Sequence, residues 1–101
     1  YKRALAIDEK ALAPDHPAVA IDLNNLAGLY YYQSNFEAAE PLYQRALAIG
    51  EKALGPGHPT VATILESYAV MLLITGRYNE AAVLRARANA IRLIRPRYAS
   101  T

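Results

Sequence analysis

The sequence repeats itself with a period of 42 residues. When residues 1–42 are aligned with residues 43–84, 19 of the 42 positions are identical, and a third copy begins at Arg85 and ends near Arg97. Self-similarity at a fixed period of about 20 to 50 residues is typical of chains built from stacked supersecondary units. The period therefore predicts a repeat architecture, in which each unit packs mainly on its neighbours.

Prolines and glycines divide each period into two helices. Pro17 and Pro59 are typical first-turn prolines, Asn35 is a candidate N-cap, and Gly76 is a candidate left-handed residue at a helix end. Pro41 falls inside a helical pattern that stays in phase around it, so we expect that helix to continue. The prediction is five helices, at residues 1–12, 17–33, 36–54, 59–75 and 78–95, followed by a tail at 96–101.

Small residues recur at matching positions of the two periods. Two antiparallel helices approach closely where small side chains meet, and larger side chains then fill the space around them. Such a helical hairpin buries its apolar surface fully only when the next hairpin stacks on it. We therefore expect an all-α fold, one superhelical segment of antiparallel helix pairs over residues 1–101. The recurring alanines are Ala27, Ala39, Ala46, Ala69, Ala81 and Ala88.

The composition excludes several classes of protein. The chain has no cysteine, which excludes disulfides and thiolate metal sites, and its 53% of hydrophobic residues excludes the disordered class. A net charge of +2 is too small to imply an anionic partner. The longest apolar run, residues 68–74, is far shorter than the roughly 18 residues of a membrane span. We expect a cytoplasmic protein that does not enter membranes.

The repeated residues carry a family resemblance. Leu23, Leu26, Ala27 and Tyr30, followed by Ala39, Tyr43 and Ala46, resemble the tetratricopeptide repeat. The 42-residue period, the LNNLA and EPLYQRAL segments and the LGPGHP linker are similar to the kinesin-light-chain subtype, which also occurs in bacterial proteins. The resemblance covers essentially the whole chain. It implies a superhelix of helix pairs that acts as a scaffold and holds short peptides or partner domains in a concave groove.

In this family the groove is lined by the first helix of each pair. By resemblance, the groove residues of the first full pair are Ile21, Asn24, Asn25, Gly28, Tyr31 and Tyr32. Those of the second pair include Thr63, Glu66, Ser67 and Val70. An asparagine amide both donates and accepts hydrogen bonds, as the backbone of an extended peptide requires. The alternative is that Asn24 and Asn25 are ordinary solvated residues.

Two residues of the second pair depart from the family pattern. Glu66 and Ser67 stand where the first pair has Asn24 and Asn25. A carboxylate in the groove would repel an acidic peptide. The preference of kinesin light chains for acidic peptides is therefore not expected here.

The sequence holds no pattern typical of a catalytic or metal site. His16 and His58 occupy equivalent positions of the repeat, so we expect them on separate loops, as turn residues beside Pro17 and Pro59. A zinc site would need further ligands converging on one point. A nucleophile elbow and a phosphate-binding glycine loop are also missing from the sequence. We expect no enzymatic activity, no catalytic residues and no cofactor.

The end of the chain is rich in arginine. Arg85, Arg87, Arg92, Arg95 and Arg97 follow the last acidic residue, Glu80. A basic helix of this kind could contact nucleic-acid phosphates, although a solvated terminal surface explains it better. The three consecutive tyrosines 30–32 point in different directions, so they do not form one stacking platform for bases.

The two ends of the array differ. At the last helix, Arg85 and Asn89 replace the apolar residues Tyr43 and Leu47, which is typical of a polar C-terminal cap. Residues 1–12 form a second helix without its first helix, so the chain is expected to be the C-terminal part of a longer array. Its exposed apolar side predicts self-association into a homo-oligomer. The residues of that side are Ala4, Leu5, Ala11 and Leu12.

The sequence thus leaves two main functions open. The first is a non-catalytic scaffold that binds a protein or a short peptide in its groove. The second is a structural segment that caps a longer array or self-associates and has no ligand of its own. Nucleic-acid binding is the less favoured third possibility.

Overall fold

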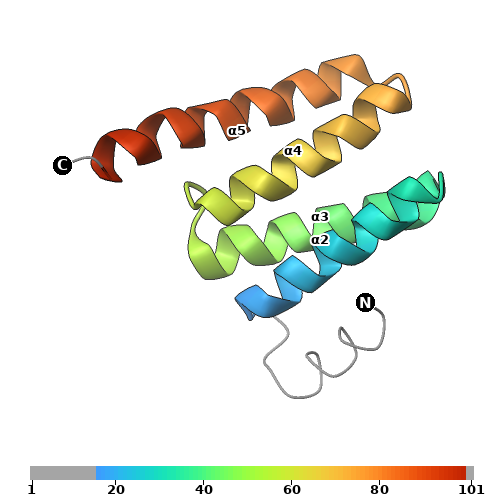
Figure 1. Cartoon of the computed structure of the whole chain (residues 1–101), viewed down its shortest axis with the longest axis horizontal. Coiled ribbons are helices and arrows are strands. Elements are labelled where there is room, and N and C mark those ends of the chain that lie inside the picture. The colour runs from blue at the N-terminus through green and yellow to red at the C-terminus, as the bar shows by residue number, and fades with distance from the viewer. Residues whose placement is uncertain (1–15, 100–101) are drawn as a thin grey trace.

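The computed structural model describes residues 16–99, which form four helices in two antiparallel pairs (Figure 1). The first pair is α2 (Pro17–Tyr32) with α3 (Phe36–Leu54), and the second is α4 (Pro59–Ile74) with α5 (Tyr78–Ala99). The pairs stack through α3 and α4, and α2 also contacts α4. The all-helical architecture predicted from the period is confirmed over this part of the chain.

The helices begin where the sequence predicts, but one prediction about their ends is wrong. The predicted helix at residues 1–12, the first of the expected five, lies outside the described residues. The predicted tail at 96–101 is partly helical, because α5 continues to Ala99. Pro96 lies in the last turn of α5, where it cannot donate to the carbonyl of Arg92 and its ring crowds that carbonyl, yet the helix continues past it to Ala99. α3 continues through Pro41, as expected.

Histidine side chains cap the first helix of each pair. The Nδ1 atom of His16 accepts a hydrogen bond from the backbone N–H of Ala18 at 3.1 Å, and Nδ1 of His58 accepts one from Thr60 at 3.0 Å. Each histidine thereby satisfies a donor that the first helical turn leaves without a partner. The histidines were expected only as turn residues, so the capping role was not predicted. Asn35 caps α3 as predicted, accepting from Ala38 at 3.4 Å.

The first helices of both pairs end in the same left-handed turn, made by different residues. Gly76 has the predicted positive φ, +83°, and its repeat equivalent Ser34 adopts φ +59°. In both turns a backbone N–H bonds back to a carbonyl five residues earlier, which closes a Schellman motif. These bonds run from Asn35 to Tyr30 at 2.9 Å and from Arg77 to Leu72 at 2.8 Å. Glycine adopts this conformation freely, whereas other residues adopt it at a cost of about 1–2 kcal/mol.

Replacing Ser34 with glycine is therefore expected to stabilise the protein. The gain should be about 0.5–1 kcal/mol, since the relief of the left-handed strain is partly offset by the greater freedom of glycine in the unfolded chain. Urea unfolding followed by circular dichroism measures it. The reverse change, Gly76→Ser, should destabilise by a similar amount. A lower urea midpoint for Ser34→Gly would contradict this account of the turn.

The recurring alanines lie where the helices meet. All six are at most 1% exposed, and they belong to three buried clusters with larger side chains from neighbouring helices. In one cluster Ala27 of α2 and Ala39 of α3 surround Tyr43, and in another Ala88 of α5 packs with Val61 and Leu65 of α4. The predicted alternation of small and large residues is confirmed. This alternation lets the two helices of each pair pack closely, and the two pairs then contact each other through α3 and α4.

A polar network joins α3 to α4 and to the turn after α4. The Tyr68 hydroxyl and Nη1 of Arg77 both donate hydrogen bonds to Oε2 of Glu40, each at 2.6 Å. The amide of Gln44 donates to the Tyr68 hydroxyl at 3.1 Å. Partial burial raises the pKa of Glu40, but the bonds from Tyr68 and Arg77 outweigh it, so the net pKa lies below its usual value. Glu40 is therefore ionised at neutral pH and fixes how the second pair sits on the first.

Two arginines of α5 pair with acidic residues of the helices beside it. Arg87 donates to Glu51 of α3, and Arg92 donates to Glu66 of α4. Both arginines belong to the basic segment that could contact nucleic-acid phosphates. Their charges are instead partly neutralised within the protein, which weakens the nucleic-acid hypothesis.

Candidate functional site

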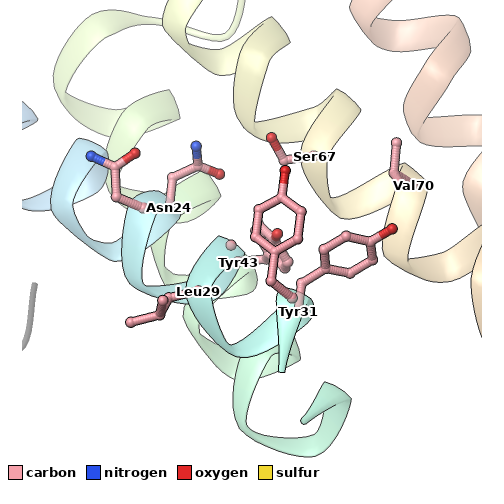
Figure 2. Close-up of a pocket in the computed structure, with 9 residues that line it drawn as sticks. Asn24, Leu29, Tyr31, Tyr43, Ser67 and Val70 are labelled. Atoms are coloured by element: carbon pink, nitrogen blue, oxygen red, sulfur yellow. The ribbon is translucent and has the colours of Figure 1, made fainter. Parts of the chain in front are cut away.

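An open hollow of about 500 Å³ lies between α2 and α4, the first helices of the two pairs. Figure 2 shows Asn24 and Leu29 projecting from α2 and Ser67 and Val70 from α4, with Tyr31 and Tyr43 between them. The hollow is lined by Asn24, Asn25, Gly28, Leu29, Tyr31, Tyr32, Tyr43, Ser67 and Val70. None of these lining residues carries a charge at neutral pH, so the surface is apolar with neutral hydrogen-bonding groups.

Seven of the ten predicted groove residues line this one hollow, and three do not. The three are Ile21, Thr63 and Glu66. Ile21 is 46% exposed, and the Thr63 hydroxyl bonds to the carbonyl of Pro59 in its own helix at 3.3 Å. The carboxylate of Glu66 pairs with Arg92. The argument that Glu66 would repel an acidic peptide therefore loses its basis at this hollow.

The predicted self-association residues cannot be placed. Ala4, Leu5, Ala11 and Leu12 all fall before residue 16 and lie outside the described residues.

Sequence reasoning missed two lining residues, Leu29 and Tyr43. Tyr43 was placed in the core by its position in the repeat, and its ring is indeed buried, stacked on Tyr68 with 5.6 Å between ring centres. Tyr43 nevertheless lines the hollow, and its hydroxyl lies beside Gly28, 4.0 Å from where a Cβ atom would stand. The signal that could have revealed it is Gly28, which has no side chain to cover the end of the phenol ring.

The three consecutive tyrosines differ in their surroundings. Tyr30 and Tyr31 are both partly buried against the same cluster, and Tyr31 and Tyr32 line the hollow. The Tyr31 ring contacts Tyr32 edge-on at 5.4 Å between centres and Phe36 at 6.0 Å. The Tyr31 ring thus packs against a ring on each side, of which Tyr32 is itself 84% exposed.

One polar atom of the lining has no hydrogen-bond partner among the described residues. The side-chain oxygen of Asn24 is buried, and no donor of the described chain reaches it. Leaving a buried acceptor without a partner costs about 1–3 kcal/mol. Such atoms are rare in folded proteins and call for an explanation, of which a ligand donor is one.

The described residues also bear on two other kinds of site. Within residues 16–99, no three potential ligating side chains of His, Cys, Asp or Glu gather at one point. No helix among those described is both long enough and apolar enough to cross a bilayer. The two histidines act as helix caps.

Two stacked antiparallel pairs, joined by tight turns and repeated every 42 residues, define an α-helical repeat protein. The sequence profile of the tetratricopeptide repeat family matches residues 1–52 and 22–92. These matches cover most of the chain, so the chain belongs to the tetratricopeptide repeat family. Repeats of this family generally mediate protein–protein interaction and scaffolding, and they are typically non-catalytic.

The chain is also similar to nephrocystin-3. Over 42 residues it is 52% identical to nephrocystin-3 of Xenopus laevis, of Xenopus tropicalis and of Mus musculus. That segment is 42% of this chain and only 3% of each relative. The match has the length of one repeat period, so it concerns the repeat unit and not the whole relative.

Proposed function

We propose that this chain is a protein- or peptide-binding scaffold whose ligand lies in the hollow between α2 and α4. The observation that carries the proposal is the buried, unpartnered oxygen of Asn24 in a hollow built by the first helices of both pairs. A backbone N–H of an extended peptide is a donor of the kind this oxygen lacks. The tyrosines of the hollow supply apolar contact area at a low entropic cost.

The test uses a library of random twelve-residue peptides displayed on phage, selected against the protein, with the enriched peptides then synthesised. The double variant Asn24→Ala with Tyr31→Ala is expected to weaken their binding by at least tenfold in isothermal titration calorimetry, while the helical circular dichroism remains. The matched control is Tyr78→Ala with Asn79→Ala on α5, two exposed residues away from the hollow. Equal binding by the hollow variant, or no enriched peptide, would count against the proposal.

A second function, capping of a longer array, is supported by one comparison between the pairs. Gly50 of α3 faces α4 closely, because a Cβ atom there would lie 3.4 Å from Ile64 and 3.5 Å from Val61. Its repeat equivalent in α5 is Arg92. A further pair could not approach α5 as α4 approaches α3 without displacing this arginine. Arg85 and Asn89 are also exposed, although so are Val83, Leu93 and Ile94.

The repeat subtype, the cellular location and self-association are further parts of this proposal. The 42-residue period and the LGPGHP linker favour a kinesin-light-chain-like subtype, as found in bacterial proteins. A cytoplasmic location and self-association through residues 1–12 stay predictions. Analytical ultracentrifugation tests the self-association, and a monomer at high concentration would contradict it.

A further inference from the structure

The hydroxyl of Tyr43 is a hydrogen-bonding group at the hollow that has no partner among residues 16–99. The residue is only 2% exposed, and its ring is fixed between α2 and α4 by the stack on Tyr68. Tyr43 lines the hollow, its hydroxyl lies 4.0 Å from where a Cβ atom at residue 28 would stand, and none of the hydrogen bonds of the described residues uses it. A buried polar group aimed at an open space in this way is positioned for an incoming partner.

Gly28 gives access to this hydroxyl. A Cβ atom at residue 28 would lie 4.0 Å from the Tyr43 oxygen, and no other atom would lie within that distance. Any side chain there would therefore extend over the hydroxyl. The second pair has no glycine beside a buried tyrosine at these positions, because the repeat equivalents of Gly28 and Tyr43 are Val70 and Arg85. In the described chain the opening is thus specific to the first pair.

The hollow favours an uncharged guest. Burial, and then the neighbouring Tyr31 and Tyr32, raise the pKa of Tyr43 to about 12, so its hydroxyl is a neutral donor at physiological pH. The lining offers no charged side chain that could compensate a buried carboxylate or ammonium group for its lost hydration. A purely apolar guest is also unfavourable, because it would cover the hydroxyl and leave it unbonded.

The second unpartnered group is the side-chain oxygen of Asn24, a residue that lines the same hollow. Asn24 is one helical turn before Gly28, and residues four apart on a helix are neighbours at about 5–6 Å. The Asn24 side chain lacks a donor for its oxygen, whereas the Tyr43 hydroxyl can donate. A primary carboxamide carries an acceptor and a donor on one planar group, so it can serve both.

We propose that the Gly28 opening is a subsite for a glutamine or asparagine side chain of the bound peptide. Its carbonyl oxygen accepts a hydrogen bond from the Tyr43 hydroxyl, and its NH₂ group donates to the oxygen of Asn24. Tyr31 and Leu29 flank the methylene stem of the guest side chain. This inference rests on the proposed function, since it names the chemistry that the same hollow selects.

The test uses four capped synthetic peptides, acetyl-Ala-Gly-Ala-X-Ala-Gly-Ala-amide, with glutamine, glutamate, leucine or lysine at X. Dissociation constants come from NMR titrations that follow the backbone amide of Gly28. The glutamine peptide is expected to bind about three- to tenfold more tightly than the other three. This is the gain in affinity that one or two neutral hydrogen bonds typically give. Equal affinities, a preference for another guest, or no shift at Gly28 with the glutamine peptide would overturn the subsite.

Two variants locate the preference. Tyr43→Phe removes the hydroxyl but keeps the buried ring, and Gly28→Val fills the opening. Both should abolish the preference for glutamine, whereas Tyr78→Phe on the exposed start of α5 should retain it. A preference that survives Tyr43→Phe would overturn the role of the hydroxyl. Library-selected peptides that still depend on Asn24 and Tyr31 would show that only the subsite had failed and not the binding function.

Discussion

Replacing Tyr43 with alanine is expected to destabilise the protein by about 3–5 kcal/mol, the range measured for large aromatic residues removed from cores. Tyr43 is 2% exposed and stacks on Tyr68, so its loss opens a cavity at the point where α2, α3 and α4 meet. Native stabilities are only about 5–15 kcal/mol, and a chain with two described pairs belongs near the lower end. Urea unfolding of Tyr43→Ala, followed by far-ultraviolet circular dichroism, should therefore show little or no native baseline before the unfolding transition.

The control is the same substitution at an exposed tyrosine. Tyr78 is 66% exposed at the start of α5, and Tyr78→Ala should change the free energy of unfolding by no more than about 0.5 kcal/mol. Tyr43→Phe should also stay near wild type in stability, because the hydroxyl that it removes has no partner in the described chain. If Tyr43→Ala unfolds at the wild-type urea concentration, the stacked junction does not hold the two pairs together.

Replacing Glu40 with glutamine is expected to cost about 1–3 kcal/mol at neutral pH, since it weakens charge-assisted hydrogen bonds from both Tyr68 and Arg77. The Glu40 side chain is 24% exposed, so the effect should exceed that of a surface ion pair. The matched control is Glu80→Gln, which removes the other partner of Arg77. Glu80 is 57% exposed, and its removal should cost less than about 1 kcal/mol.

The contribution of Glu40 should depend on pH. The pKa of Glu40 is lower in the folded protein than its ordinary value of 4.5, so folding favours the ionised form. Its stabilisation is present above about pH 4.5 and is lost as the pH falls through the folded pKa. The stability difference between wild type and Glu40→Gln should therefore narrow in acid. A difference that is constant from pH 7 to about pH 3 would contradict this assignment.

Much of the fold could be predicted because the helices begin and end at residues with known local preferences, and these residues recur in both periods of the repeat. Pro17 and Pro59 suit the first helical turn, and Gly76 suits a left-handed helix end. The end of α5 was mispredicted, because the helix continues through Pro96 to Ala99 although proline disfavours a helix beyond its first turn. Ser34 could not be predicted as left-handed from its own preference. Its repeat equivalent Gly76 was the only available signal.

The hollow was predicted less completely than the fold. The sequence placed Ile21, Asn24, Gly28 and Tyr31 together in a groove, and all of them except Ile21 line one space. Tyr43 was missed because a register argument classifies a residue as buried or exposed as a whole. A tyrosine can bury its ring and still present its hydroxyl to a ligand. The pairing of Glu66 with Arg92 joins residues 26 positions apart and could not be read from spacing.

The network around Glu40 also bears on how cooperatively the chain unfolds. In a stack of similar units, the strength of the contact between neighbours decides whether they melt together or one at a time. Tyr68 and Arg77 lie at the middle and beyond the end of α4, and both are anchored to a single carboxylate of α3. Opening the second pair therefore breaks both bonds at once. We expect the amide hydrogens of α3 and α4 to report the same free energy of opening in hydrogen exchange. Glu40→Gln should separate them into a set with a higher and a set with a lower free energy of opening.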